Sequence, residues 1–161
     1  FLRTFYDGVI GKGGVYGFGV FEDGKIHGFV IGTGDSSKFF AQALKAHFLK
    51  LSLLLTVRLI KNPTLIKNVL ETLQYSKKAV GPKTELVVIA VDKDYQGRGV
   101  GKLLVEALES AFRKEEIKRY KLTVHADKKA VGFYEHLGYS RLSSFWLYGK
   151  MWYVYDKKIP S

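Results

Sequence analysis

The sequence predicts a mixed α/β (α+β) fold, built as one domain over residues 1–161. Strand-like runs of β-branched residues alternate with segments of helical spacing, an order typical of a sheet flanked by helices. A length of 161 residues with 47% hydrophobic residues is enough for one well-filled core. The composition excludes a disordered chain. No uninterrupted apolar run of about 20 residues is present, which excludes an integral membrane protein.

The N-terminal segment is predicted to contain a helix end followed by a β-hairpin. Apolar residues within 1–10 are spaced for one helical face, so this segment is predicted to be the end of a helix. Residues 15–21 and 25–32 are predicted strands, and Asp23-Gly24 supplies the turn between them.

A basic segment, residues 36–84, follows the hairpin. It holds nine Lys and Arg against one acid, Glu71, and so carries +8 of the formal net charge of +11. Residues 38–60 are apolar over most of a helical circumference, and Asn62-Pro63 is a helix start before a second amphipathic stripe. The segment is therefore predicted to be a helical hairpin inserted before the central strand and resting on the sheet.

The rest of the chain alternates between strands and helices. The β-branched run at 85–91 is typical of a central strand, and apolar residues between 100 and 111 have helical spacing. The remaining predicted elements are a strand at 120–126, a short helix at 130–136 and aromatic-rich strands within 141–159.

The strongest functional signal is the glycine-rich turn between the central strand and the next helix. It reads Gln96-Gly-Arg-Gly-Val-Gly-Lys102. Glycines allow close approach of the backbone, and a helix N-terminus offers unpaired N–H groups and a positive dipole end, so the turn suits a pyrophosphate. It is not a Walker loop, because Leu103 follows Lys102, and the alternating glycines do not fit a dinucleotide fingerprint.

Gln96, Gly99 and Gly101 match the pattern Gln/Arg-x-x-Gly-x-Gly/Ala. A second block, Asp127-Lys-Lys-Ala-Val-Gly-Phe-Tyr-Glu-His-Leu-Gly-Tyr139, lies at the spacing expected after it. Together the two blocks resemble the GNAT superfamily of acetyl-CoA-dependent N-acetyltransferases, over about residues 85–139. Asp127 departs from the asparagine often found there, and a carboxylate cannot donate a hydrogen bond as an amide can.

The resemblance implies a GNAT-like sheet in which two parallel strands, ending near Val91 and Ala126, splay apart around the pantetheine arm of acetyl-CoA. Backbone groups of the central strand would pair with the pantetheine, and amides of the turn would hold the pyrophosphate. The resemblance implies these cofactor-binding residues: Ile89, Ala90, Val91, Gln96, Gly97, Arg98, Gly99, Val100, Gly101, Lys102, Asp127, Ala130 and Phe133.

Two side chains are candidates for the chemistry. Tyr134 matches the position of the family's usual acid, and a phenol of reference pKa about 10 can donate to a leaving thiolate. The alternative is a half-buried packing residue. Glu85 precedes Gln96 by eleven residues, the offset of the catalytic glutamate in histone acetyltransferases of this superfamily. The alternatives are a solvated carboxylate at a strand end, or another group or water chain acting as the base.

A metal centre is not expected. The chain has no cysteine, and the four histidines lack the spacing of metal ligands. His125, at a strand end near the expected acceptor position, is a weaker candidate for substrate contact, with a capped strand-end imidazole as the favoured interpretation.

The function predicted from the sequence is direct transfer of an acetyl group from acetyl-CoA to a primary amine within a ternary complex. The charge of segment 36–84 favours an anionic acceptor, such as a nucleotide-linked amino sugar. The alternatives are a catalytically silent acyl-CoA-binding module and, less favoured, a nucleic-acid-binding protein, since no known nucleic-acid-reading motif is present.

Partners and location are less constrained by the sequence. The favoured interpretation of segment 36–84 is that its apolar face packs on the sheet, its lysines are solvated, and it covers the acceptor site as a lid. A homodimer interface and contact with a membrane surface are alternatives, and membrane contact is disfavoured. No signal peptide is visible, which favours the cytoplasm. The sequence begins at Phe1 rather than Met, which leaves open an incomplete N-terminus.

Overall fold

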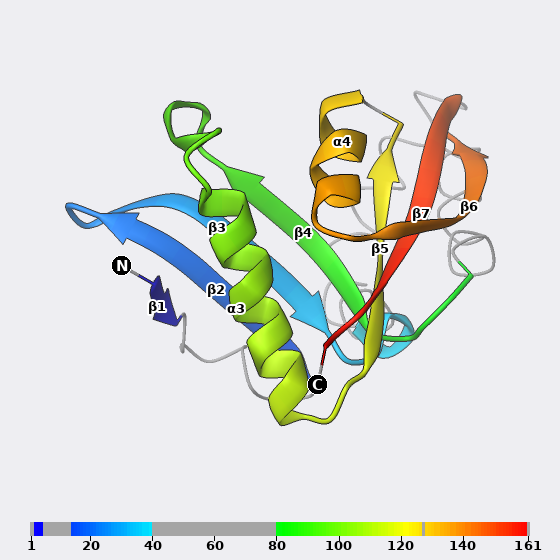
Figure 1. Ribbon diagram of the computed structural model, residues 1–161, viewed down its shortest axis with the longest axis horizontal. Helices are drawn as coiled ribbons and strands as arrows, with labels where there is room; N and C mark the ends of the chain where they lie inside the picture. The colour runs from blue at the N-terminus through cyan, green and yellow to red at the C-terminus, as the bar shows by residue number, and fades with distance from the viewer. Residues whose placement is uncertain (1, 5–13, 40–79, 127, 161) are drawn as a thin grey trace, which may run out of the picture.

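The computed structural model describes residues 2–4, 14–39, 80–126 and 128–160 (Figure 1). Seven strands form one sheet in the order β1-β2-β3-β4-β5-β7-β6. The strands are β1 (Leu2–Thr4), β2 (Val15–Glu22), β3 (Lys25–Thr33), β4 (Glu85–Val91), β5 (Arg119–His125), β6 (Ser140–Leu147) and β7 (Lys150–Lys158). The helices are η1 (Lys93–Tyr95), α3 (Val100–Lys114) and α4 (Lys128–His136).

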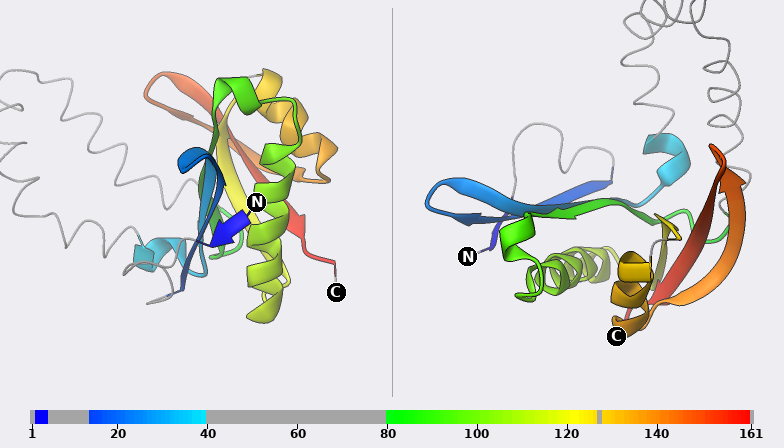
Figure 2. Two further views of the ribbon diagram at one scale, coloured as in Figure 1. Left: turned by 90° about the vertical axis from the view of Figure 1, so that its left-hand side faces the viewer. Right: turned by 90° about the horizontal axis from the view of Figure 1, so that it is seen from above.

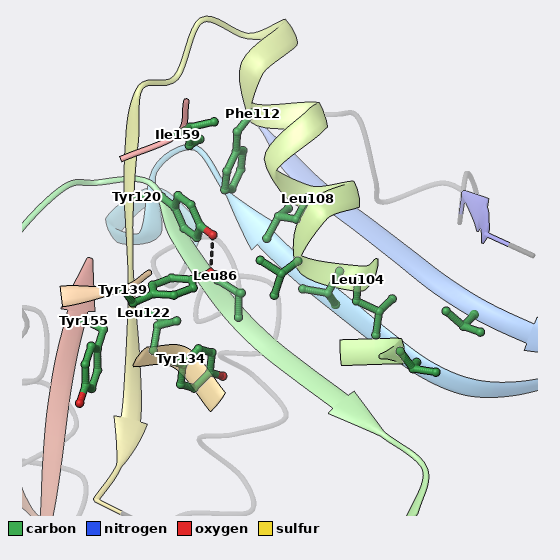
Figure 3. Close-up of a cluster of buried hydrophobic side chains, with 14 residues drawn as sticks. Leu86, Leu104, Leu108, Phe112, Tyr120, Leu122, Tyr134, Tyr139, Tyr155 and Ile159 are labelled. Carbon is green, nitrogen blue, oxygen red and sulfur yellow. Dashed lines mark hydrogen bonds between the residues drawn. The ribbon is translucent and has the colours of Figure 1, made fainter. Parts of the chain in front are cut away.

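Helices α3 and α4 lie on the same face of the sheet (Figure 2). Helix α3 buries Leu104, Leu108 and Phe112 completely, each with 0% exposure, against β2, β3 and β4. These residues repeat every four positions, so they line one face of the helix. The buried side chains beneath α3 and α4 join into one core (Figure 3).

The pair formed by β4 and β5 is parallel, and it is short. Only Glu85 and Leu86 of β4 have partners on β5, namely Lys121 and Leu122. One residue later Val87 is an extra residue in the ladder with β3, because Ile31 pairs with Val88 and Gly32 pairs with Leu86. A bulge bends the strand that carries it. Beyond this bulge the two strands diverge toward their C-terminal ends (Figure 1).

A polar cluster lies within the core below α4. The Tyr120 hydroxyl donates to Glu109 Oε1 at 2.6 Å, and Lys157 Nζ lies 2.7 Å from the same oxygen. The hydroxyls of Tyr120 and Tyr139 are hydrogen-bonded to each other. Burial raises the pKa of both phenols, so both stay protonated. The cluster ties α3 to β5 and β7.

The structure confirms the predicted α/β class, the hairpin of β2 and β3, the central strand and the helix after the glycine turn. The predicted helix end at 1–10 is wrong at residues 2–4, which form strand β1 paired antiparallel with β2. Helical spacing in so short a window is weak evidence, and the outer edge of β2 offers unpaired backbone groups that a strand satisfies.

The predicted helical insertion lies mainly outside the described residues. Residues 36–39 are helical, and the carboxylate of Asp35 caps their start by accepting from the Lys38 N–H at 3.1 Å. Residues 40–79 are not described. The single-domain organisation over 1–161 stays a prediction.

Candidate active site

A pocket of about 460 Å³ lies where β4 and β5 part. Strand β4 contributes its C-terminal half, the glycine turn contributes the mouth, and α4 contributes the opposite wall. The pocket is lined by Ile89, Ala90, Val91, Gln96, Gly97, Gly101, Lys129, Ala130, Phe133 and Tyr134. All of these except Lys129 were predicted from the sequence, so two distant sequence blocks meet in one cavity.

The glycine turn is shaped by one side-chain hydrogen bond and two left-handed glycines. The Gln96 side-chain amide donates to the carbonyl of Val91 at 3.0 Å, which closes the turn onto the end of β4. Gly97 and Gly99 have φ values of 73° and 80°, which glycine adopts without steric cost. A Cβ at either position would meet nothing within 4 Å. The outer surface of the turn is therefore open to a ligand.

Helix α3 begins within this glycine-rich segment, at Val100, with Gly99 as its N-cap residue. The first N–H groups of a helix have no partner within it, and the helix dipole adds positive potential there. Val100 is 7% exposed and its side chain packs in the core, so it can offer a ligand only its backbone. Lys102 is exposed, with its Nζ 3.8 Å from Glu106 Oε1. The turn and the helix start thus have the features that suit an anion.

Gly101 permits close packing between the two helices that flank the pocket. A Cβ at this position would lie 3.0 Å from Cζ and 3.1 Å from Cε2 of Phe133. Phe133 therefore reaches across from α4 to the first turn of α3. A larger residue at position 101 would displace this ring.

Tyr134 lies deep in the pocket wall with 7% exposure. Its ring contacts Tyr139 edge-on, with 5.4 Å between centroids, and lies 6.5 Å from the ring of Tyr155. The hydroxyls of Tyr134 and Tyr155 point in different directions (Figure 3). Burial raises the pKa of Tyr134 to about 12, so its phenol is protonated at neutral pH and can donate a hydrogen bond.

Glu85 is placed apart from this pocket. Its side chain is 3% exposed, does not line the cavity, and lies 4.0 Å from Lys121 Nζ, measured from Oε2. Leu86 and Ile89 face the helices, so the bulge at Val87 leaves Glu85 facing the other side of the sheet. The two candidate catalytic residues therefore lie on opposite faces of the sheet.

Of the remaining candidate residues that the structure describes, only Lys129 lines the pocket. The Arg98 guanidinium lies over the ring of Tyr95, 5.3 Å from its centroid. Asp127 lies outside the described residues. Lys129 was missed, although its basic side chain in the first turn of a helix beside the motif was a usable signal. His125 does not line the pocket, and its ring contacts Trp152 edge-on at 5.6 Å.

Among the described residues, no three His, Cys, Asp or Glu side chains gather closely enough to hold a metal ion. None of the described helices has both the length and the hydropathy needed to cross a membrane.

These features indicate what kind of ligand the site suits. Parallel strands that part around a pocket, with a glycine turn and a helix N-terminus at its mouth, suit a ligand with an anionic head and a long, thin arm. Residues 73–145 match the family model described as an acetyltransferase (GNAT) domain. The resemblance to the GNAT superfamily predicted from the sequence is thereby confirmed.

Several related proteins are named acetyltransferases. An uncharacterized acetyltransferase of Streptococcus pyogenes is 42% identical over 64 residues, which cover 40% of this chain and 40% of that protein. The GCN5-related N-acetyltransferase 2, chloroplastic, of Arabidopsis thaliana is 41% identical over 51 residues, covering 32% of this chain and 19% of that protein. The chain spans less than half the length of the curated relatives it matches.

Solved structures show the same fold. The ribosomal-protein-S18-alanine N-acetyltransferase of Escherichia coli matches with a TM-score of 0.58 at 19% identity, over 94% of this chain and 72% of that one. The PaiA N-acetyltransferase of Thermoplasma acidophilum, solved in complex with coenzyme A, matches with a TM-score of 0.54 at 16% identity, over 90% of this chain and 61% of that one. The chain therefore has the GNAT fold.

Proposed function

We propose that this chain is an N-acetyltransferase that moves an acetyl group from acetyl-CoA to a primary amine by direct transfer in a ternary complex. One observation carries the proposal: a single pocket is lined both by the glycine turn at its mouth and by Tyr134 in its wall. An anionic head and a reactive thioester at opposite ends of one thin molecule match this arrangement.

The residues present fit acetyl-CoA. The open surfaces of Gly97 and Gly99 admit a pyrophosphate to the backbone N–H groups of the turn. Beyond Leu86 the edge of β4 that faces the gap has no β5 partner, so backbone groups of residues 89–91 can pair with the pantetheine amides. The Val91 carbonyl already accepts from Gln96. Lys129 adds a positive charge to the wall of the pocket.

Acetyl-CoA supplies the acetyl thioester. In the reaction a C–N bond to the amine forms and the C–S bond breaks, while the amine loses a proton and the thiolate gains one. Tyr134 donates a hydrogen bond to the leaving sulfur and stabilises its charge. Because its pKa is raised to about 12, it serves better as a donor of this hydrogen bond than as a full proton source.

Glu85 is proposed as the base that takes the proton from the amine, acting through water because it does not line the cofactor pocket. Its position on the other face of the sheet supports an acceptor that approaches from that side. Lys121 Nζ, 4.0 Å from Glu85 Oε2, would help to hold the carboxylate in position.

A second candidate function is a catalytically silent acyl-CoA-binding module. The ion pair between Glu85 and Lys121 favours it, since a carboxylate engaged by a buried lysine can have a structural role alone. Under this alternative, Glu85→Gln would change stability, and no amine would be acetylated by the wild-type protein.

The acceptor is proposed to be anionic, because residues 36–84 carry a net charge of +8 by sequence. A panel of primary amines that differ only in carrying a phosphate, a carboxylate or no charge tests this. A higher kcat/KM for the anionic members is expected, and a preference for cationic amines would contradict it.

Calorimetric titration with acetyl-CoA tests cofactor binding, with two matched glycine variants. Gly99→Ala and Gly149→Ala both place a methyl group at a positive φ, 80° and 69°, with nothing within 4 Å of the new Cβ. Each costs about 1–2 kcal/mol of stability. Gly99→Ala is expected to weaken acetyl-CoA binding at least tenfold, since it alters the turn, whereas Gly149→Ala leaves it unchanged. No saturable binding by the folded wild type would refute the proposed function.

A further inference from the structure

We propose that Tyr95 is a positioning residue that fixes the anion-binding turn against the β2–β3 hairpin, and so sets the affinity for the phosphates of the cofactor. The inference rests on the proposed function, because it assigns the turn to acetyl-CoA. We call Tyr95 and its contacts with Glu22, His27, Asp92 and Arg98 the Tyr95 latch.

Both ends of the Tyr95 side chain are held by the hairpin. Its ring stacks on the imidazole of His27, with 3.9 Å between centroids and 21° between planes. Its hydroxyl donates to Glu22 Oε2. A planar side chain held at its face and at its tip has little freedom to turn. Because Tyr95 is the last residue of η1 and immediately precedes Gln96, it fixes the start of the turn.

The backbone and Asp92 fasten the other end of the same short segment. The Asp92 N–H donates to the carbonyl of His27 at 2.8 Å, and the Tyr95 N–H donates to the carbonyl of Asp92 at 2.9 Å. The Asp92 carboxylate lies 3.5 Å from Nδ1 of His27, whose imidazole is mostly buried. Residues 92–95 are thus attached to the hairpin through His27 at both ends.

The latch also reaches into the turn itself through Arg98. The guanidinium of Arg98 lies 5.3 Å from the centroid of the Tyr95 ring, at cation–π distance. The ring therefore contacts the hairpin through His27 and the turn through Arg98. Because Arg98 is itself a residue of the turn, this contact restrains a cation that would be available to phosphate oxygens bound there.

A latch is needed because the turn before α3 carries glycine at positions 97 and 99. Glycine has the largest conformational freedom of any residue, and ordering it on ligand binding weakens affinity. A turn already fixed in the free protein avoids this loss, which is the advantage of preorganisation. A tyrosine that only stabilised the hairpin would alter the unfolding midpoint and leave ligand selectivity unchanged.

The test compares CoA with pantetheine, which lacks the phosphates, in Tyr95→Ala, Tyr95→Phe and the wild type. Affinity for CoA is measured by calorimetry and affinity for pantetheine by competition against CoA. Tyr95→Ala is expected to weaken CoA binding about tenfold and to leave pantetheine affinity unchanged. Tyr95→Phe keeps the stack and loses the bond to Glu22, so its CoA affinity should fall between the two. Tyr148→Ala, which removes an exposed tyrosine from the β6–β7 turn, is the control and should bind CoA as the wild type does.

The outcomes separate the two proposals. Unchanged CoA affinity in a folded Tyr95→Ala variant overturns the latch while the proposed function stands. Equal losses for CoA and pantetheine also overturn it, because the effect would then not concern the phosphates. Absence of CoA binding by the wild type overturns the proposed function and the latch with it.

Discussion

Replacing Tyr134 by phenylalanine removes one hydroxyl from the wall of the pocket and little else. The ring, which makes the packing contacts with Phe133 and Tyr139, is retained. We therefore expect unchanged affinity for acetyl-CoA and a lower kcat. A phenol of pKa about 12 and a thiol of reference pKa about 8.5 differ by about 3.5 units, so full proton transfer to the sulfur is unfavourable by about 5 kcal/mol. The loss should then be that of a stabilising hydrogen bond, about 100-fold in kcat.

The raised pKa of Tyr134 also determines how kcat/KM and stability should depend on pH. The donor is the protonated phenol, which is fully present below its pKa and is lost as the pH rises through about 12. An ordinary phenol would be half ionised at pH 10. The kcat/KM of the wild type should therefore show no loss attributable to Tyr134 up to about pH 10.5. The unfolded chain ionises this phenol near pH 10, so the same shift contributes stability below pH 10 that is lost between pH 10 and about 12.

The assay is a continuous measurement of released CoA thiol, with folding checked by circular dichroism at each pH. Tyr155→Phe is the matched control, because its ring is adjacent to Tyr134 while its hydroxyl donates to Glu135 at 2.9 Å. It should keep the wild-type kcat. Wild-type kcat in Tyr134→Phe, or a descending limb near pH 10 that Tyr134→Phe abolishes, would refute the reasoning.

Two further predictions concern the core. Lys157→Met leaves the buried carboxylate of Glu109 without its cation at 2.7 Å, and should lower the free energy of unfolding in urea by about 3–5 kcal/mol. Adding Glu109→Gln should recover part of this, and no recovery would argue against the ion pair as the cause. Gly32→Ala places a Cβ 2.7 Å from Cδ1 of the buried Leu108, so it should cost about 1–3 kcal/mol. Gly132→Ala, in a helix with nothing within 4 Å, is its control and should not destabilise.

The sequence predicted the parts of the site that depend on local patterns. Glycine spacing followed by helical periodicity identified the turn from Gln96 to Lys102, and the second block placed Phe133 and Tyr134 on a short helix. Both patterns are local in the sequence, and residues of both blocks line the pocket. The family resemblance then supplied what local patterns cannot, namely that the two blocks meet.

Features that depend on pairing between distant residues were not predicted. Tyr95 and Glu22 are 73 residues apart in the sequence, and neither residue type signals the contact. The strand at residues 2–4 depends on the open edge of β2 and not on its own composition. The bulge at Val87 lies within a continuous β-branched run, where no alternation of polar and apolar residues reveals a change of face.

The extra residue at the Val87 bulge accounts for two properties of the site that would otherwise need separate causes. At Val87 the ladder between β4 and β3 gains a residue, and directly before it the ladder between β4 and β5 ends. The bulge therefore lies where the gap that holds the pocket begins. The same residue shifts the alternation, so that Ile89 and Val91 face the helices together with Leu86. Without it, Glu85 would share a face with Ile89 and Val91 and would point toward the cofactor side. In the proposed reaction, the bulge therefore both admits the thioester and keeps the base on the opposite side, from which the amine approaches.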